Sequence, residues 1–312
     1  MNFSDRAIPS CWTAHGHHAA SCRAQAGRTP GGTEYHRPAL IEGIHGQYAA
    51  AGSRIVNANT FGASAHKLAG SAYTLEQVIT AGIENCKRAC APYGALTALD
   101  VGPLGELLEP SGTLAFEDAV AEYARIVKAG EAAGADLIFF ETYTDLYELK
   151  AALLAAKENT HLPILASMSF EAGGRTFTGC TVESFAATAR GLGADAVGIN
   201  CSLGPKEIFP MAKRLAEAVP GNFPVFVKPN AGLPRADGSG YDITPQLFAL
   251  QMKPTGSCAC LPPAAAVAPP RSSSSCSTAL CRLHPGRPAH RMPSVLCTPV
   301  DTVTVDGITV VG

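Results

Sequence analysis

The sequence contains no apolar run of the roughly 18 residues that a membrane-spanning helix requires, so an integral membrane protein is not expected. Its amino terminus also lacks the apolar core of a secretory signal, and we therefore expect a cytoplasmic protein. A marked excess of charge is missing as well, because the formal net charge is only -2. Nucleic acid and anionic membranes are consequently poor candidates for partners.

Acidic residues are absent from two long stretches, 6–33 and 253–300. Both stretches are rich in Cys, Pro, Ser, Arg or His, and neither has helical or strand periodicity, so we predict no secondary structure there. The eleven cysteines are odd in number and irregularly spaced, which favours reduced thiols over a disulfide framework. Cys86 and Cys90 are spaced for one helix face, which indicates core packing rather than a metal site.

Between these stretches, patterns typical of buried strands alternate with amphipathic helical patterns. We predict six strands, near 54–61, 96–101, 136–140, 163–168, 196–199 and 224–227. We predict helices near 74–90, 116–133, 145–157, 181–190 and 205–218. Thr74 and Gln77 form a capping-box pair, and Thr144 and Thr181 are the expected caps of two later helices. Apolar strands joined by helical crossovers predict a parallel α/β sheet.

A polar or sulfur-bearing residue stands at the carboxyl end of each predicted strand. These residues are Asn59, Asp100, Glu141, Ser167, Cys201 and Asn230. In a (β/α)8 TIM barrel such ends form one ring around one pocket, and a thiol before a helix is placed where α/β folds carry their chemistry. A barrel needs eight strands, and its first and last strands would fall in the two acid-free stretches, where the sequence does not define them.

Five motifs, in the same order along the chain, resemble the homocysteine S-methyltransferase family. They are ANTFGA at 58–63, DVGPLGELLEP at 100–110, ETYTDLYELKAA at 141–152, GINCSLGP at 198–205 and KPNAGLP at 228–234. The resemblance covers about 38–250 and is strongest to the amino-terminal homocysteine-binding domain of cobalamin-dependent methionine synthases. Residues 294–312 are similar to the linker before the folate domain of those enzymes, so the chain would be an amino-terminal fragment.

The resemblance implies transfer of a methyl group to homocysteine, forming methionine. Family members hold zinc with three thiolates, and the metal activates the substrate thiol. Cys201 would be one of these zinc ligands and is the predicted catalytic residue. Glu141 would receive the substrate amino group, and Asn230 would lie beside the metal. Asn59, Asp100 and Ser167 would complete the substrate site. The donor would be methylcobalamin on another module, so cobalamin-binding and folate-binding modules are the implied partners.

The chain departs from the family pattern at two places, since no adjacent cysteines follow Cys201 and no Asp-Gly-x-x-Gly-Thr occurs near the amino terminus. Codons for PPAAAVAPP at 262–270, read from their third base, can encode Ala-Ser-Gly-Cys-Cys-Gly-Thr-Thr-Pro if the following bases complete the last codon, and this nearly restores the missing zinc motif. GHHAASCRA at 16–24 can likewise encode Gly-Thr-Met-Leu-Gln-Ala-Ala-Gly. We therefore hypothesise that both acid-free stretches are out-of-frame translations, with the partner cysteines expected near Ala265 and Ala266.

This hypothesis divides the chain into four segments. They are an aberrant amino-terminal segment at 1–36, a homocysteine-binding barrel core at 37–252, an aberrant low-complexity segment at 253–293 and the start of a linker at 294–312.

Structural explanations stay open for individual residues. A single cysteine at a strand end, such as Cys201, is usually a small buried hydrophobe. Glu141 is also placed to stabilise the amino terminus of the following helix through the helix dipole. Asp100 and Asn59 are compatible with structural turns.

Two other functions also stay open. The chain could be an inactive fragment whose exposed sheet edges invite aggregation. It could instead be a zinc-free barrel that binds an amino acid through Glu141 and Ser167. If zinc is bound without the missing motif, Cys258 and Cys260 are the alternative ligands in this sequence.

Overall fold

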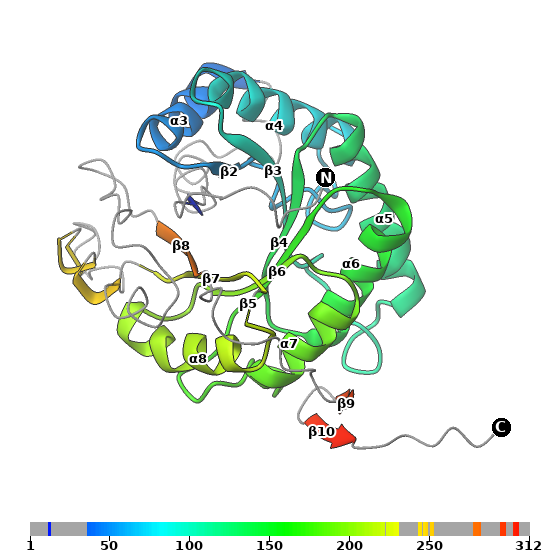
Figure 1. Ribbon diagram of the computed structural model, residues 1–312. Helices are drawn as coiled ribbons and strands as arrows, with labels where there is room; N and C mark the ends of the chain where they lie inside the picture. Colours follow the sequence, from blue (N-terminus) through cyan, green and yellow to red (C-terminus); the bar gives the residue numbers. More distant parts are fainter. Residues whose placement is uncertain are drawn as a thin grey trace, which may run out of the picture.

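The computed structural model describes residues 12–13, 36–221, 223–230, 243–244, 246–248, 250–252, 277–281, 294–297 and 302–305. In this part of the chain, a curved sheet is surrounded by helices (Figure 1). Among the described helices, none combines the length and the apolar character needed to span a bilayer.

Six consecutive parallel strands form most of the curve. They are β2 (Ile55–Asn57), β3 (Leu96–Val101), β4 (Leu137–Tyr143), β5 (Ile164–Met168), β6 (Ala196–Asn200) and β7 (Val225–Lys228). The predicted parallel α/β sheet is thereby confirmed. Its strands are short and almost wholly buried, which is why they read as continuous apolar runs.

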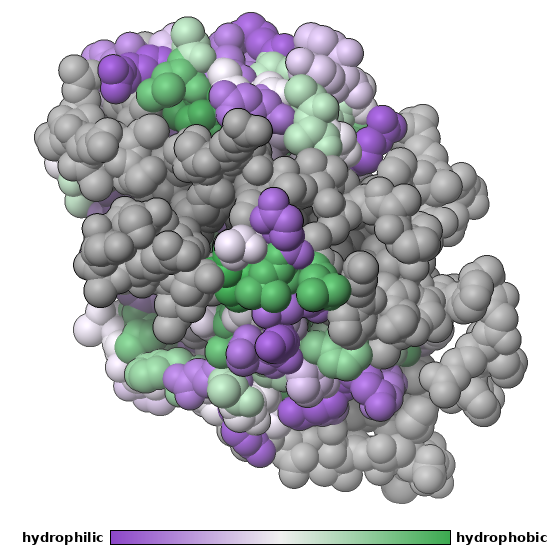
Figure 2. Space-filling model, turned by 90° about the vertical axis from the view of Figure 1, so that its left-hand side faces the viewer, coloured by the Kyte–Doolittle hydropathy of each residue, from purple (hydrophilic) through white to green (hydrophobic). Residues whose placement is uncertain are grey.

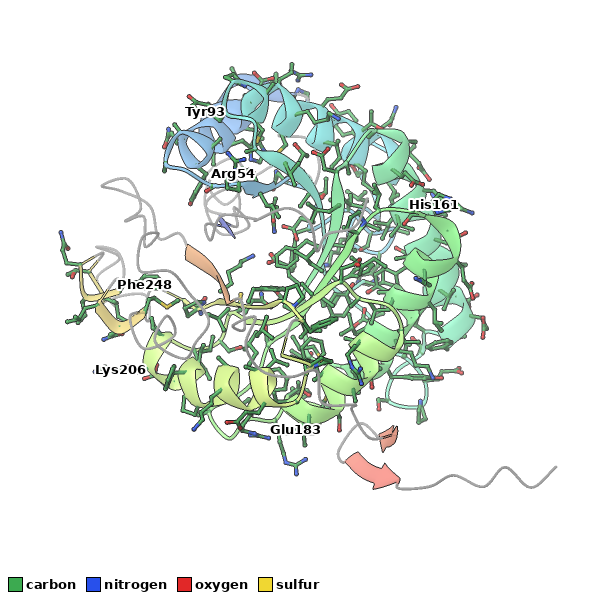
Figure 3. The ribbon with its side chains drawn as sticks, viewed as in Figure 1. Arg54, Tyr93, His161, Glu183, Lys206 and Phe248 are labelled. Atoms are coloured by element: carbon green, nitrogen blue, oxygen red, sulfur yellow. The ribbon has the colours of Figure 1, made fainter. Side chains whose placement is uncertain are left out.

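Helices connect the strands and pack on their outer side. They are α4 (Leu75–Cys90), followed by the 3-10 turn η2 (Ala91–Tyr93), α5 (Phe116–Ala132), α6 (Leu146–Asn159), α7 (Val182–Gly191) and α8 (Pro205–Glu217). Glu183 on α7 and Lys206 on α8 lie outside the curve of strands, whereas side chains fill its inside (Figure 3). An additional helix, α3 (Pro38–Ala50), precedes β2 and was not predicted.

Two short strands lie beside the parallel run. β1 (Trp12–Thr13) pairs in parallel with β2, and β8 (Ser277–Cys281) pairs antiparallel with both β7 and β1, which closes the ring. No secondary structure was predicted in the two acid-free stretches, and this prediction was wrong for residues 12–13, 277–281 and 294–297, which form short strands. The antiparallel β8 also departs from the parallel eight-stranded barrel that was expected. On the side of the molecule at the left of Figure 1, hydrophobic residues are visible between hydrophilic ones (Figure 2).

A second small sheet lies outside the ring. β9 (Ser294–Cys297) and β10 (Thr302–Val305) pair antiparallel with one another, within the stretch predicted to be a linker.

The inside of the curve contains an apolar layer. It consists of Ile55, Ala98, Leu137, Phe139, Leu165, Ala196 and Phe226. The rings of Phe139 and Phe226 contact one another with centroids 5.3 Å apart. A Cβ on Gly198 would lie 2.3 Å from the Phe226 ring, so the close approach of β6 and β7 requires glycine there. This layer closes the amino-terminal half of the ring and leaves the carboxyl ends of the strands for polar side chains.

The capping box predicted at the start of α4 is present. The Thr74 hydroxyl accepts a hydrogen bond from the Gln77 N–H at 3.2 Å, and the Gln77 side chain accepts one from the Thr74 N–H at 2.9 Å. Thr181 caps α7 as predicted. The prediction for α6 was wrong, because Asp145 rather than Thr144 is the cap: its carboxylate accepts from the Tyr147 N–H at 3.0 Å.

We expect Thr74→Ala to lower the free energy of unfolding by about 1 kcal/mol, since it removes the hydroxyl that accepts from the Gln77 N–H at the start of α4. Urea denaturation followed by circular dichroism measures the change. Thr113→Ala, at an exposed position, is the matched control and should change stability by less than about 0.5 kcal/mol. Equal effects of the two substitutions would show that the capping box does not stabilise the helix.

Candidate functional site

A layer of polar side chains lies directly above the apolar layer, because side chains two residues apart on a strand point to the same side. Phe139 and Phe226 face the inside of the ring, so Glu141 and Lys228 face it too, one step nearer the carboxyl ends. The same two-residue step leads from Ile55, Ala98 and Leu165 to the polar residues of their strands, and on β6 two such steps separate Ala196 from Asn200. We use the name polar layer for Asn57, Asp100, Glu141, Ser167, Asn200 and Lys228, all of which are buried.

Glu141 and Lys228 form a buried ion pair across the polar layer, in which Lys228 Nζ donates to Glu141 Oε2. Their side chains are 6% and 3% exposed. Lys228 Nζ also lies 5.0 Å from the centroid of the Phe139 ring. Burial opposes the charge on Lys228, but the charge and the hydrogen bond of Glu141, with smaller contributions from its other neighbours, outweigh burial and raise its pKa. The pair therefore holds one positive and one negative charge inside the ring.

Asp100 lies beside this pair, and its buried position favours the neutral form of its carboxyl. Burial and the adjacent negative charge of Glu141 raise the pKa of Asp100 well above its ordinary value. Thr60 fixes the backbone at this point: its hydroxyl donates to the Asp100 carbonyl at 2.8 Å and accepts from the Asp100 N–H at 3.0 Å. An acid that favours its neutral form adds little negative charge beside the ion pair.

Asn200 joins the carboxyl ends of three neighbouring strands. Its Oδ1 accepts hydrogen bonds from the Thr142 N–H at 3.0 Å and the Ser167 hydroxyl at 2.8 Å, and its Nδ2 donates to Thr142 Oγ1 at 2.7 Å. The Ser169 hydroxyl donates to the Asn200 carbonyl at 2.8 Å. These bonds hold β4, β5 and β6 in register beside Cys201, whose sulfur lies 3.4 Å from Asn200 Nδ2.

Cys201 sits in an unusual backbone conformation directly after β6. Its φ is 59°, and Ser202 and Thr142 also have positive φ values of 59° and 67°, a region that non-glycine residues rarely adopt. The Cys201 N–H donates to the Lys228 carbonyl at 3.1 Å, which ties the turn to β7. These three residues lie at the carboxyl ends of β4 and β6. Such backbone conformations are typical of sites where strain positions functional groups.

The thiol of Cys201 is partly buried and protonated in this environment. Burial and the negative charge of Glu141 raise its pKa, and these two effects exceed the opposite effects of Lys228 and of the Thr142 and Asn200 side chains. Because the charge of Lys228 does not offset burial and the charge of Glu141, the thiolate is not favoured and Cys201 is a weak nucleophile.

The structure brings four of the predicted site residues together at one end of the ring: Asp100, Glu141, Ser167 and Cys201. Asn59 is partly buried in the turn after β2. Asn230 follows β7, where its N–H donates to the Leu203 carbonyl at 2.9 Å, so it lies next to the Cys201 turn. The positions agree with the expected ring of strand ends, while the role of each residue stays a prediction.

Sequence reasoning missed Lys228 and Asn200 as members of the site. Lys228 is the first residue of the KPNAGLP motif. The available signal was its spacing of two residues from the apolar Phe226, which puts both side chains on the same side of the strand. Asn200 adjoins Cys201 and was read only as part of the GINCS motif.

The described residues do not by themselves form a zinc centre. In the described ranges, no group of three or more His, Cys, Asp or Glu side chains could hold a metal ion. Cys201 lies in the site, whereas Cys86, Cys90 and Cys180 are buried elsewhere, and none of these four residues forms a disulfide. As predicted, Cys86 and Cys90 pack in the core, with sulfurs 3.8 Å apart. A catalytic zinc requires about three protein ligands, and these residues supply one.

The proposed partner positions lie outside the part of the chain that the structure describes. This applies to Ala265 and Ala266, where the hypothesis places the missing cysteines, and to the alternative ligands Cys258 and Cys260.

Comparison with known proteins connects this chain to one family. A family model described as homocysteine S-methyltransferase matches residues 18–268. Methionine synthase of Mycobacterium tuberculosis is 30% identical over 229 residues, which cover 68% of this chain and 19% of that protein. Methionine synthase of Mycobacterium leprae is 31% identical over 231 residues, with the same coverage of 68% and 19%. The chain thus spans about a fifth of the length of these curated relatives.

Solved structures show the same fold. The oxidized form of the homocysteine methyltransferase MmuM from Escherichia coli has a TM-score of 0.63 at 20% identity, covering 76% of this chain and 85% of that chain. The metallated form of that protein has a TM-score of 0.61 at 21% identity, covering 76% of this chain and 86% of that chain.

Proposed function

The chain belongs to the homocysteine S-methyltransferase family, as its motifs predicted, and we propose that its polar layer binds homocysteine for methyl transfer to the substrate sulfur, forming methionine. The observation that carries the proposal is the buried carboxylate of Glu141, which lies at the same end of the ring as Cys201. Relatives described as methionine synthases support the reaction. This charge is buried at the carboxyl ends of the strands, which is where barrels of this architecture place their active sites.

Glu141 supplies the anion that an amino acid's ammonium group requires. Its carboxylate is buried, so a charge-assisted hydrogen bond there is stronger than the same bond in water. Asp100, held neutral, keeps its proton and acts as a hydrogen-bond donor next to Glu141 instead of repelling it. With the ammonium at Glu141, the substrate sulfur would point toward Cys201, and Asn200 and Thr142 would fix the orientation of that end of the site.

The residues around the sulfur do not complete a reactive centre within the described part of the chain. We propose that three thiolates, from Cys201 and from the two positions near Ala265 and Ala266, hold zinc in an in-frame chain. Zinc bound there would lower the pKa of the homocysteine thiol. The chain as given would bind the metal poorly and would be impaired, because only the first of these ligands is retained.

The rest of the proposed system lies beyond this chain. Since the chain spans about a fifth of its curated relatives, we propose that cobalamin-binding and folate-binding modules complete the enzyme and that methylcobalamin is the donor. We also propose that the in-frame barrel has the (β/α)8 arrangement, with the strand after 252 running parallel to β7. The core would then comprise residues 37–252 together with the restored ends.

Binding and turnover separate this proposal from its alternatives. We expect isothermal titration of the purified chain with homocysteine to give about one binding site per chain, and assay with methylcobalamin to give little methionine. An amino acid of different shape, such as lysine, is the control ligand and should bind far more weakly. A folded chain that does not bind homocysteine would refute the proposed function and leave the inactive fragment. Binding together with no turnover after the zinc motif is restored would favour the zinc-free amino-acid-binding barrel.

A further inference from the structure

Lys228 is a positive charge within the site to which the proposed function assigns no task. It stands at the carboxyl end of β7, and its side chain crosses the ring to reach Glu141 on β4. It lies above the Phe139 ring and is almost completely excluded from solvent. A buried lysine is rarely retained without a partner, and here that partner is the carboxylate expected to receive the substrate.

Substrate binding therefore changes the partner of Lys228. When an ammonium group from outside takes the Glu141 carboxylate, the Lys228 ammonium loses its main partner inside a buried site. Asp100 is a weaker partner than Glu141, because burial and the charge of Glu141 raise the pKa of Asp100 well above its ordinary value. An unpaired buried ammonium carries a large desolvation penalty, so a ligand that contributes only a positive charge binds at a disadvantage.

We propose that Lys228 is a specificity-determining residue, which binds the α-carboxylate of the substrate when the α-ammonium of the substrate binds Glu141. This inference rests on the proposed function. A zwitterionic amino acid carries both charges on one carbon, so its two groups match the adjacent positive and negative groups of the Glu141–Lys228 pair. One internal ion pair is exchanged for two ion pairs with the ligand. Because the ligand is a zwitterion, its binding does not change the net charge of the polar layer.

The inference requires discrimination against amines that lack a carboxylate. Two ligands test it directly: homocysteine, and its decarboxylated analogue, which keeps the thiol and the ammonium. For the wild-type chain, isothermal titration should give a dissociation constant about 30-fold or more weaker for the analogue, the effect of leaving one member of a buried charged pair without a partner. This comparison needs no substitution, so it does not depend on how a variant folds.

Lys228→Met tests the assignment to this residue. Methionine has a similar length and no charge, so the ratio of the two dissociation constants should fall to within about threefold. Lys228→Arg keeps the cation and should keep most of the discrimination. Lys206→Met, at an exposed position on α8 outside the curve of strands (Figure 3), is the matched control and should leave the ratio unchanged.

Each outcome has a defined meaning. A wild-type ratio near one, or a ratio that Lys228→Met does not change, would overturn the inference while leaving homocysteine binding intact. An unchanged ratio with both ligands bound more tightly would identify Lys228 as a competitor for Glu141 rather than a carboxylate ligand. If the folded wild-type chain binds neither ligand, the proposed function fails and this inference fails with it.

Discussion

Glu141→Gln is expected to abolish measurable homocysteine binding and to lower the free energy of unfolding by about 3–5 kcal/mol. Glutamine has nearly the same shape, so the loss comes from charge rather than from packing. Without the Glu141 carboxylate, the Lys228 ammonium stays buried without its main partner, and a substrate ammonium has no anion to bind. Urea denaturation followed by circular dichroism and isothermal titration with homocysteine measure the two effects.

A second variant separates stability from binding. In Glu141→Gln combined with Lys228→Met, the buried charge is removed together with its partner, so most of the lost stability should return. Homocysteine binding should not return, because the anion is still missing. Glu158→Gln on the exposed side of α6 is the matched control, with an expected change below about 0.5 kcal/mol. If Glu141→Gln alone were as stable as the wild type, the ion pair would not be buried as described.

The regular part of the fold could be predicted because its signals are local. Six apolar strands alternate with amphipathic helices, and this alternation permits few arrangements other than a parallel sheet. Caps at Thr74 and Thr181 were also predictable, since each hydroxyl meets a backbone N–H three residues ahead. Thr144 failed as a cap because the adjacent Asp145 competes for the same role with a charged and stronger acceptor.

Helix α3 lacked such signals. No side chain caps its first turn, and Gly43 and Gly46 in its middle lower helical propensity. Its five buried residues show that packing against the rest of the fold, which local patterns do not contain, stabilises it.

The site was predicted in part for a similar reason. Cys201 and Glu141 stand in recognisable motifs at strand ends, so sequence alone placed them on one side of the sheet. Lys228 pairs with a residue 87 positions away, and no local pattern reveals a contact at that separation. Asn200 was hidden because its role depends on bonds to two other strands. Long-range polar pairing is therefore what the structure adds to the sequence.

Restoring the predicted reading frame should convert the chain from a poor zinc binder into a stoichiometric one. The in-frame chain replaces 262–270 with Ala-Ser-Gly-Cys-Cys-Gly-Thr-Thr-Pro and takes the same frame across 253–293. Two adjacent thiolates would then join Cys201 to give the three protein ligands of a catalytic zinc site. We expect about one zinc per restored chain after dialysis, and far less than one for the chain as given, by inductively coupled plasma measurement.

Zinc should also stabilise the restored fold, since a metal that binds only the folded chain adds its binding energy to folding. At free zinc about 1,000 times its dissociation constant, the gain is about 4 kcal/mol. Thermal melting with and without a chelator measures this effect independently of activity. Cys201→Ser in the restored chain should lose the zinc and the chelator-sensitive shift, whereas Cys180→Ser, buried away from the site, should keep both.

The coding DNA across 250–295 decides whether the restored sequence is the right one, because only particular codons for 262–270 contain the adjacent cysteines in another frame. An open frame without those codons would remove the basis for the substitution. If the chain as given bound one equivalent of zinc, the frame hypothesis would also be contradicted, since the metal would then have ligands other than the missing cysteine pair. If the codons are present and only the restored chain binds zinc, the loss of two sulfur ligands at one strand end would account for weak zinc binding by a family member that retains Glu141 and Cys201.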